Sequence, residues 1–556
     1  MTTRITRPPS EQLLPAVKSP DEALKSHHAL VEALCRPEAW PEPLPHGVRF
    51  EVIETHISTL LLAGNGAIKL KKPIALPFLD FSTPELRHHF CNEELRINRR
   101  TAPDLYRGVL PVTGPASAPR LGGEGAVLDW ALWMRRFDND QLYDRLARTG
   151  LLTTAHIDAL AGVIAAFHAG LTPSPPGYGS AAVARRWALD NFRSLEDPGL
   201  VAGLPAAARE QLAALAASGD SRLAAIAPLL EQRRTTGAVV ECHGDLHLGN
   251  IVHHEGRPLL FDAIEFNPEL RHLDRLNDVA FTFMDLCDHA LPRLAWRLLS
   301  QYLERTGDYG GLPLLRWFAV DRALVRAKVA LMGARQAPSG EAGPAIAAAA
   351  RRIGLADALA HPGPARLIMT SGPSGSGKST VALVLAEALG AVRIRSDVER
   401  KRLHGMGPTE RATDPARLYN AGSTASTYRR LADAAGAALE GGVSAIVDAA
   451  FLRRDERDAM RALARLRRVS CILIECTAPE ALLRERIAHR IAHQHDPSDA
   501  DWDVLSLQLR VREPLQPDEH ADAEIFDTNF AGSELPDRVD ALLRQLGCTP
   551  LACAGA

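Results

Sequence analysis

The sequence lacks any apolar stretch long enough to cross a bilayer, and its N-terminal segment has no apolar core of a secretory signal peptide. Its eight cysteines include no CxxC pair and no tight framework of the kind found in small secreted domains. These absences exclude a membrane-spanning protein and a disulfide scaffold. We expect a cytoplasmic protein with reduced thiols and no membrane partner.

An excess of charge of one sign is also missing. The chain has 64 Lys and Arg against 67 Asp and Glu, a formal net charge of −3. No general basic field is available to hold nucleic acid, so nucleic acid is not an expected partner. Any positive charge that binds phosphate must be local. The 46% hydrophobic and 24% charged residues are typical of a globular protein, and 556 residues exceed one ordinary domain.

The N-terminal half changes from strand patterns to helix patterns along the chain. Residues 1–25 contain several prolines and little periodicity, which predicts a loose tail. Residues 26–137 are rich in strand patterns, and apolar runs on either side of an Asn-Gly pair predict a hairpin within 48–72. Residues 138–335 have mainly helical apolar spacing. A small strand-rich lobe followed by a larger helical lobe is the outline of a kinase-like fold.

The C-terminal half has a different pattern. Residues 336–364 are rich in Ala, Gly and Pro and predict a linker with one short helix. From 365 to 556, strand and helix patterns alternate, which is typical of a parallel sheet covered by helices. The predicted fold class is therefore multi-domain: an α+β kinase-like half, then a three-layer α/β/α domain. The two halves show no repeat of each other.

The sharpest motif lies in the second half. GPSGSGKS, over residues 372–379, is an unbroken GxxxxGK[ST] sequence between an apolar run and a helical pattern. In such a loop, glycines let backbone N–H groups surround a phosphate at a helix N-terminus, the lysine reaches the β- and γ-phosphates, and the hydroxyl coordinates magnesium. The candidate ATP-binding residues are Gly372, Pro373, Ser374, Gly375, Ser376, Gly377, Lys378, Ser379 and Thr380, with Lys378 also catalytic and Ser379 also a metal ligand.

Two acidic residues follow predicted strands in this half. Asp397 would lie at the carboxyl end of its strand, where doubly wound sheets bind ligands and where a carboxylate can deprotonate an acceptor hydroxyl. Helix N-capping is the alternative role. Asp448 follows the apolar run SAIV and suits the Walker-B role beside magnesium, the alternative being an ordinary strand-end carboxylate.

The first half contains a second phosphotransfer motif. HGDLHLGN, over residues 243–250, has the HxDxxxxN spacing in which a carboxylate and a metal-binding amide can face one phosphate. Asp245 is the predicted base and Asn250 a magnesium ligand. Asp262, after the apolar run PLLF, is the predicted second metal ligand.

A lysine that anchors phosphate is expected on the strand within GAIKLKK. Period-two alternation places Lys69 and Lys71 on one face, with Lys69 the first choice and Lys71 the second. The acidic partner on the following helix is Glu93 or Glu94. The alternative is a charged face exposed to solvent.

The motif set HGDLHLGN, with its lysine strand and later Asp262, resembles the aminoglycoside phosphotransferase and choline kinase superfamily over residues 26–335. No GxGxxG loop is present between residues 48 and 66, so the cover over ATP would be built differently. The resemblance implies transfer of the ATP γ-phosphoryl group to a hydroxyl of a small molecule.

The motifs GPSGSGKST, SDVERK, IVDAAFL and ALLRERIAHRIAHQHDPSDAD resemble small P-loop kinases, among them gluconate kinase, the zeta-toxin kinases and polynucleotide kinases, and the AAA-type ATP-binding domains. In those kinases a pair of lid arginines clamps the transferring phosphate. The resemblance therefore implies this role for Arg486 and Arg490, and less so for Arg484.

Together these features predict a bifunctional phosphotransferase that uses ATP and Mg²⁺ in both halves, with small-molecule acceptors. Three alternatives remain at this point. One half could be an ATP sensor that regulates the other, the P-loop half could be an ATPase switch, or it could phosphorylate a nucleic-acid 5′ end.

Overall fold

The computed structural model describes residues 19–76, 79–338, 340–411, 418–493, 498 and 501–552. They form two compact units, one up to Asp138 together with Asp262–Asn267, the other of 139–261 and 268 onward. Most of the predicted tail lies outside the described residues. Helix α1 (Pro20–Leu34) begins inside the range predicted as tail, because Ser19 and Glu22 form a capping box.

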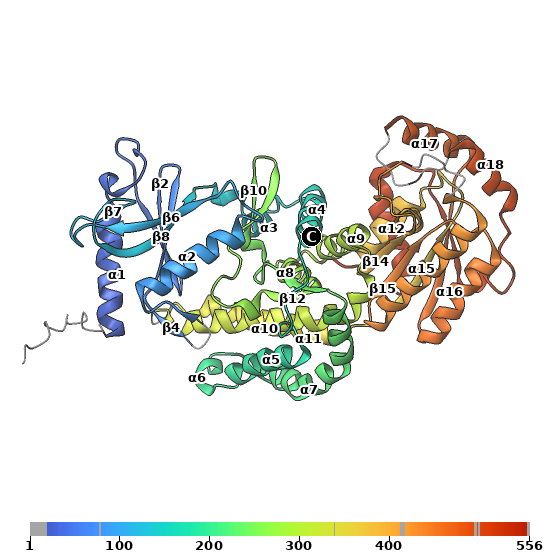
Figure 1. The fold of residues 1–556 in the computed structure, drawn as a ribbon. Coiled ribbons are helices and arrows are strands. Elements are labelled where there is room, and N and C mark those ends of the chain that lie inside the picture. Colours follow the sequence, from blue (N-terminus) through green and yellow to red (C-terminus); the bar gives the residue numbers. More distant parts are fainter. Residues whose placement is uncertain are drawn as a thin grey trace, which may run out of the picture. The chain divides into compact units, whose positions relative to one another are not determined.

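The first unit is built on an antiparallel six-stranded sheet with strand order β1-β2-β3-β8-β6-β7. The predicted hairpin is confirmed as β2 and β3, which are joined by a tight turn at Gly64 and Asn65. Figure 1 shows α2 lying along this sheet. The elements are β1 (Glu51–Glu54), β2 (Ser58–Ala63), β3 (Gly66–Lys71), β4 (Ala75–Leu76), β5 (Leu79–Asp80), α2 (Pro84–Asn98), β6 (Tyr106–Thr113), β7 (Arg120–Leu121) and β8 (Val127–Arg135).

The second unit begins with a mainly helical part, as the apolar spacing predicts. Two short antiparallel pairs, β10 with β11 and β9 with β12, interrupt the helices around the HGDLHLGN motif. The elements are α3 (Tyr143–Arg148), α4 (Thr154–Ala169), α5 (Ala181–Leu195), α6 (Pro198–Val201), α7 (Ala206–Thr235), β9 (Val239–Glu241), β10 (Ile251–His254), β11 (Arg257–Leu260), β12 (His272–Asp274), α8 (Arg275–Asp288), α9 (Pro292–Thr306) and α10 (Leu312–Gln336).

The segment predicted as a linker differs from expectation. It contains α11 (Gly343–Ala360), an 18-residue helix that packs on α10 and buries Ala349, Ile353 and Ala356. Small alanines let the two helices approach closely, so an Ala-rich sequence here forms a packed helix and not a free connection.

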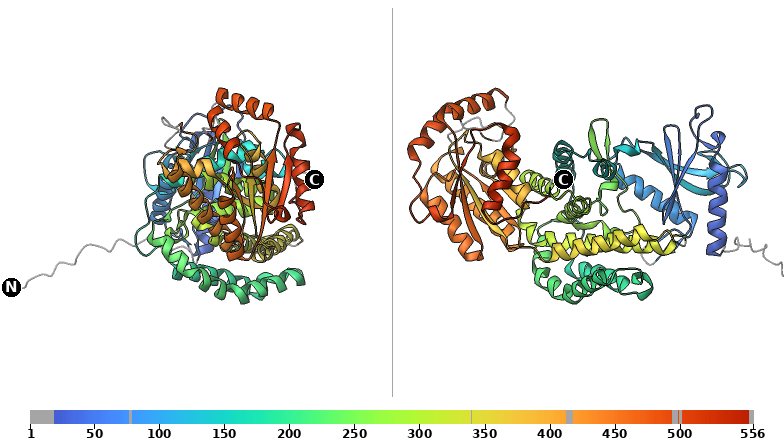
Figure 2. Two further views of the ribbon diagram at one scale, coloured as in Figure 1. Left: turned by 90° about the vertical axis from the view of Figure 1, so that its right-hand side faces the viewer. Right: turned by 180° about the vertical axis from the view of Figure 1, so that it is seen from behind.

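The rest of the second unit is a five-stranded parallel sheet with strand order β14-β15-β13-β16-β17, which confirms the predicted fold class. Alternate residues of β13 face opposite layers: Ile368 packs in the core with α12 and α19, while Leu367 and Met369 join the core with α15 and α16. Helices on both faces are visible in two further views (Figure 2). The elements are β13 (Arg366–Ser371), α12 (Lys378–Leu389), β14 (Ala391–Arg395), α13 (Ser396–Leu403), α15 (Ala421–Glu440), β15 (Ser444–Asp448), α16 (Arg454–Arg467), β16 (Ser470–Thr477), α17 (Glu480–His493), α18 (Trp502–Val511), β17 (Ala523–Asp527) and α19 (Leu535–Gln545).

Among the described residues, no helix is both long and apolar enough to cross a membrane. The hydrophobic core of the second unit is continuous from the helices α4, α8, α9 and α10 into the sheet strands β13, β14 and β15. Helix α9 packs directly on both β14 and α12. The parallel sheet therefore shares its core with the helices that precede it.

Candidate active sites

The phosphate loop, residues 372–379, connects β13 to α12 as its motif predicts. Gly372, Gly375 and Gly377 have φ angles of 136°, 83° and 81°. A Cβ atom on Gly375 would lie 2.7 Å from the carbonyl oxygen of Leu483, so this position has no room for a side chain. The glycines are required by the shape of the loop, which curls its backbone at the N-terminus of α12.

A cavity of about 800 Å³ opens at the carboxyl end of the parallel strands and contains the phosphate loop. Its lining brings together nearly all the residues that the sequence assigned to this half. They are Ser374, Gly375, Gly377, Lys378, Ser379, Thr380, Asp397, Asp448, Arg486 and Arg490. The remaining predicted residues of the same loop are buried and do not line the cavity. They are Gly372, Pro373 and Ser376.

Lys378 is folded back on its own loop, where its Nζ donates a hydrogen bond to the carbonyl oxygen of Pro373 at 3.1 Å. Burial lowers the pKa of Lys378, and the nearby carboxylates of Asp448 and Asp397 oppose that shift only in part. A phosphate group in the cavity would supply the negative charge that this lysine lacks.

Ser379 and Asp448 form a pair of oxygen ligands suited to magnesium. The Ser379 hydroxyl donates to Asp448 Oδ1 at 3.1 Å. Asp448 is the last residue of β15 and only 4% exposed, and its Oδ2 accepts no hydrogen bond among the described residues. A buried carboxylate oxygen that accepts no hydrogen bond, beside a hydroxyl, fits a hard divalent cation. The residues present therefore suit the predicted metal.

Asp397 lies in the first turn of α13 and faces the cavity. The N-cap residue of α13 is Arg395, whose side chain makes no capping hydrogen bond, so N-capping is not the role of Asp397. Burial would raise the pKa of Asp397, but Arg400, a hydrogen bond with Ser498 and Arg395 lower it overall. The carboxylate is therefore ionised and able to accept a proton.

The two predicted lid arginines lie on α17. Arg486 donates to Thr528 Oγ1 at 2.9 Å and to the carbonyl oxygen of Gly375 at 3.2 Å, which ties α17 to the phosphate loop. Arg490 lines the same cavity. Arg484 instead pairs with Glu480 on the exposed side of the helix, so its weaker candidacy finds no support.

Gln508, on α18, was not identified from the sequence. Its side-chain oxygen accepts a hydrogen bond from the backbone N–H of Ser374 at 2.7 Å. It therefore occupies a backbone donor of the phosphate loop. A single polar residue on an amphipathic helix carries no signal from which this contact could be predicted.

In the first unit, the structure gathers the predicted phosphate-anchoring residues into one buried cluster. Lys69 Nζ lies 2.7 Å from Glu94 Oε1 and 2.6 Å from Asp262 Oδ1. Lys71 Nζ lies 2.7 Å from Glu94 Oε2 and also pairs with Glu265. Glu94 is thus the acidic partner left open by the sequence, whereas Glu93 pairs with Arg96. The predicted strand face is buried, not exposed to solvent.

Opposite charges in this cluster keep Lys69 and Glu94 ionised in spite of their burial. Burial alone would lower the pKa of Lys69, but Asp262 and Glu94 raise it well above its ordinary value. Burial would likewise raise the pKa of Glu94, and the two lysines reverse the shift. Lys69 is the lysine that reaches both Glu94 and the predicted metal ligand Asp262, which favours it over Lys71.

The backbone at Asp262 is in the left-handed region, with φ of 61°, which is uncommon for a residue other than glycine. Two hydrogen bonds hold it there: Tyr106 Oη accepts from the N–H of Asp262 at 3.0 Å, and Asn98 Oδ1 accepts from the N–H of Ala263 at 2.8 Å. Strained backbone that is held by neighbours in this way is typical of functional sites.

The catalytic loop, residues 243–250, belongs to the second unit. Asn250 Nδ2 donates to Asp245 Oδ2 at 3.1 Å and to its carbonyl oxygen at 2.9 Å, so the predicted base and metal ligand are adjacent. His247 Nε2 lies 3.4 Å from Asp245 Oδ2. Partial burial would raise the pKa of Asp245, but His247 and, more weakly, Arg326 and His243 hold it well below its ordinary value. Asp245 is therefore ionised.

Two buried carboxylates on α8, which the sequence analysis missed, support this loop. Asp278 accepts hydrogen bonds from the N–H groups of His243 at 2.8 Å and Gly244 at 2.9 Å. Asp285 accepts from the N–H of Leu248 at 2.8 Å. The two acids are seven residues apart, which is two turns on one face of the helix. That spacing alone does not predict which backbone groups the two acids bind.

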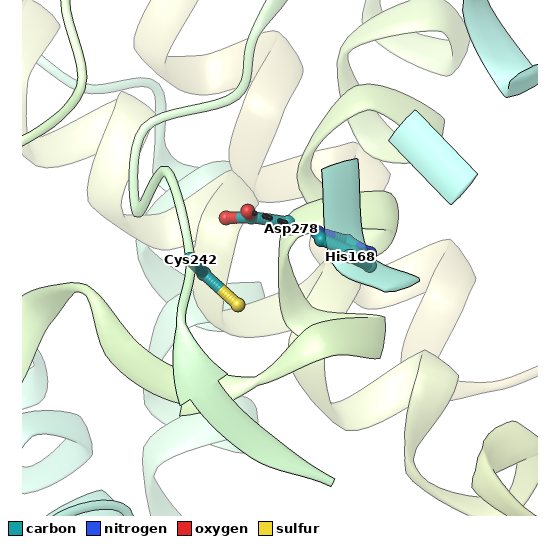
Figure 3. Close-up of side chains that lie close together, drawn as sticks. All are labelled: His168, Cys242 and Asp278. Carbon is teal, nitrogen blue, oxygen red and sulfur yellow. Dashed lines mark hydrogen bonds and ion pairs between the residues drawn. The ribbon is translucent and has the colours of Figure 1, made fainter. Parts of the chain in front are cut away.

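Asp278 is itself oriented by His168, whose Nε2 lies 3.3 Å from Asp278 Oδ2 and whose Nδ1 is 3.0 Å from Tyr302 Oη on α9. Figure 3 shows this pair together with Cys242. The three side chains could hold a metal by distance alone. However, both carboxylate oxygens accept backbone N–H groups and both ring nitrogens have partners, so the cluster is explained as a support for the catalytic loop.

Comparison with known proteins agrees with this division of the chain. The AAA domain family matches residues 367–515, the range that holds the phosphate loop, Asp397, Asp448 and both lid arginines. Over 475 residues, the chain is 31% identical to the uncharacterized proteins Rv2004c of Mycobacterium tuberculosis and Mb2027c of Mycobacterium bovis. The match covers 82% of this chain and 91% of each relative. The chain belongs to the family of these mycobacterial proteins.

Two solved structures are similar to parts of this family member. A gluconokinase from Sinorhizobium meliloti is 25% identical and covers 33% of this chain and 93% of its own, with a TM-score of 0.23. A choline/ethanolamine kinase family protein from Mesorhizobium loti is 13% identical and covers 61% of this chain and 95% of its own, with a TM-score of 0.37.

The AAA-domain match and the intact phosphate loop identify the C-terminal half of this family member as a nucleotide-binding P-loop domain. The predicted fusion of such a domain to a separate preceding region is thereby confirmed.

Proposed function

We propose that this protein is a bifunctional phosphotransferase that moves the γ-phosphoryl group of ATP to small-molecule acceptors, with one Mg²⁺-dependent site in each half. One observation carries the proposal for the C-terminal half. Lys378, the Ser379–Asp448 pair, Asp397 and Arg486 line a single cavity at the strand ends, although they come from four separate segments of the chain.

In the C-terminal half, each residue has a distinct task. The N–H groups of the phosphate loop and Lys378 hold the phosphates, while Ser379 and Asp448 hold magnesium, which supplies charge neutralisation when bound. Asp397 accepts the proton of the acceptor hydroxyl as its oxygen bonds to the γ-phosphorus, and the bond from that phosphorus to the β–γ bridging oxygen breaks to release ADP. Arg486 and Arg490 stabilise the charge on the transferring group.

The acceptor of this half is a small hydroxylated metabolite. The cavity of about 800 Å³ is in the range of pockets that enclose small molecules. Beyond the phosphate loop, its lining includes hydrogen-bonding side chains such as Tyr419 and Thr424 beside apolar side chains such as Leu507 and Val511. The hydrogen-bonding groups suit a polar acceptor that must be held in one orientation.

For the N-terminal half, Asp245 is the proposed base that accepts the proton of an acceptor hydroxyl, and Asn250 beside it is a proposed magnesium ligand. In the first unit, Asp262 is the second proposed magnesium ligand. Lys69, fixed by Glu94, would hold the phosphates of ATP. Support comes from the adjacency of Asp245 and Asn250 on the braced catalytic loop and from the full set of charges around Lys69.

The deciding experiment is a metabolite-library screen for ADP release with the wild-type chain, Lys378→Ala and Asp245→Asn. Acceptors of the C-terminal half should lose about 100-fold in rate in Lys378→Ala only, and acceptors of the N-terminal half should lose as much in Asp245→Asn only. The panel includes amino and hydroxyl metabolites, a DNA with a free 5′-hydroxyl and a sample without acceptor.

The outcomes separate the alternatives. ADP release at one unchanging rate with every acceptor and without any would identify an ATPase switch. Stimulation by the DNA alone would identify a nucleic-acid kinase. An Asp245→Asn chain that retains every acceptor-dependent activity would make the N-terminal half an ATP sensor.

A further inference from the structure

A buried ion-pair network joins α9 of the helical part to β14 of the P-loop domain, directly behind the phosphate loop. Glu304, near the end of α9, is 7% exposed. Its Oε2 accepts from Arg393 Nη2 at 2.8 Å and its Oε1 from Arg395 Nη1 at 3.0 Å. One carboxylate thus binds two guanidinium groups that β14 directs to the same side.

Each of the two arginines also contacts one of the predicted magnesium ligands. Arg393 Nη1 donates to the carbonyl oxygen of Ser379 at 3.1 Å. Arg395 Nε lies 3.6 Å from Asp448 Oδ2, the carboxylate oxygen that accepts no hydrogen bond among the described residues. Glu304 is therefore separated from each metal ligand by one arginine.

Glu304 remains ionised although it is buried. Burial alone would raise the pKa of Glu304, but Arg393 and Arg395 lower it, so the group stays a carboxylate. Arg395 lies between two carboxylates, with a hydrogen bond to Glu304 and a longer approach to Asp448. Without the charge of Glu304, a buried guanidinium would turn to the remaining carboxylate, because an unpaired buried charge is costly.

The backbone around Glu304 is held in place as well. Ser300 Oγ accepts from the N–H of Arg393 at 3.2 Å, the carbonyl oxygen of Glu304 accepts from Arg402 at 2.5 Å, and that of Gly307 accepts from Arg430 at 2.9 Å. Glu304 thus has a fixed position relative to β14, as a positioning residue requires.

We propose that Glu304 is a positioning residue for the magnesium site of the P-loop domain, contributed by the helical part of the chain. By binding Arg395, it keeps that arginine from closing on Asp448 and leaves Asp448 Oδ2 available to the metal. The inference rests on the proposed Mg²⁺-nucleotide binding at this site. It makes the metal affinity of the P-loop domain depend on a residue outside the AAA-domain range.

The test measures ADP binding by calorimetry, with Mg²⁺ and with EDTA, and takes the ratio of the two affinities. The same titrations of a Lys378→Ala chain define the contribution of the N-terminal half, which is subtracted. In Glu304→Gln, this ratio should fall about 10-fold, the size of effect typical of residues that orient metal ligands, while the affinity in EDTA stays unchanged.

Asp540→Asn is the matched control. Asp540 also forms an ion pair with α9, through Arg293 at 2.8 Å, but this pair has no contact with the phosphate loop or Asp448 among the described residues. Its ratio should equal that of the wild type. The double variant Glu304→Gln with Arg395→Gln should regain most of the lost ratio, because the competitor for Asp448 is then gone.

An unchanged ratio in Glu304→Gln, or equal losses with Mg²⁺ and with EDTA, would overturn the inference. If Glu304→Gln does not fold, as judged by its melting curve, Arg395→Gln alone decides: its ratio should not fall, and a fall would refute the proposal. A wild-type chain that binds no ADP, or binds it without regard to Mg²⁺, would instead count against the proposed function itself.

Discussion

The phosphate loop and the catalytic loop are held in shape by different means. The phosphate loop depends mainly on its own sequence, since Gly372, Gly375 and Gly377 supply the positive φ angles that its backbone needs. The catalytic loop depends on Asp278 and Asp285, carboxylates more than 30 residues further along the chain. A loop of the first kind can be recognised from a short motif, whereas the support of the second kind is visible only once the chain is folded.

The largest effect on nucleotide binding should come from a substitution in the phosphate loop. Gly375→Ala places a Cβ atom 2.7 Å from the carbonyl oxygen of Leu483 at a φ of 83°, so the backbone must move. A shift of about 1 Å at a binding loop can cost about 100-fold, and we expect nucleotide affinity of the C-terminal half to fall by that factor in calorimetry. Gly363→Ala, just before β13, has no neighbour within 4 Å and is the matched control. Equal affinities for the two variants would refute the claim that the glycines determine the loop.

A smaller effect is expected at the catalytic loop from Asp278→Asn. Both oxygens of Asp278 accept backbone N–H groups, so an amide must turn a donor toward one of them. The unsatisfied group would cost about 1–3 kcal/mol, and we expect the rate of the N-terminal half to fall about 10-fold. Turnover of the C-terminal half should not change. A parallel loss in both halves would show a general loss of stability and not a local support.

Asp285→Asn should reduce the rate of the N-terminal half less than Asp278→Asn does, because only one oxygen of Asp285 accepts a backbone N–H. The amide oxygen can keep that bond, so the rate of the N-terminal half should fall by no more than about threefold. An effect as large as that of Asp278→Asn would mean that the negative charge near the loop matters more than its hydrogen bonds.

The smallest effect concerns pH. The folded-state pKa of Asp245 is depressed by His247 against the effect of burial, so its ionised form is favoured at neutral pH and is lost only as pH falls through the lowered value. Asp245 should therefore remain ionised down to about pH 5, and its protonation should not lower the wild-type rate of the N-terminal half above that pH. In His247→Gln the pKa of Asp245 rises, and the acid limb of the rate profile should move to higher pH. An unmoved limb would show that His247 does not set this pKa.

Much of the fold could be predicted because its signals are local. The Asn65-Gly66 pair between two apolar runs predicted the β2–β3 hairpin, and the alternation of strand and helix patterns after residue 365 predicted the parallel sheet. The Ala-rich segment was predicted as a linker with one short helix, because composition alone does not show that α11 has a partner in α10.

The candidate sites divide in the same way. The phosphate loop and the Asp245–Asn250 pair could be predicted from motif spacing, and Asp397 and Asp448 from their positions after predicted strands. The choice of Glu94 over Glu93 could not be predicted, since it depends on which face of α2 meets β3. The roles of Gln508 and Asp278 are long-range hydrogen bonds to backbone groups, and a single sequence contains no pattern for them.

Helix α9 carries Tyr302 and Glu304 two residues apart, so their side chains point in nearly opposite directions, one to the His168 that orients Asp278 and the other to β14. Cutting the gene between the two halves would therefore damage whichever fragment was kept. A C-terminal fragment would lack Glu304, the carboxylate that binds both Arg393 and Arg395. An N-terminal fragment would uncover Trp296, which packs beside Gly390. Separate activities in this protein must be assigned with point variants of the full chain.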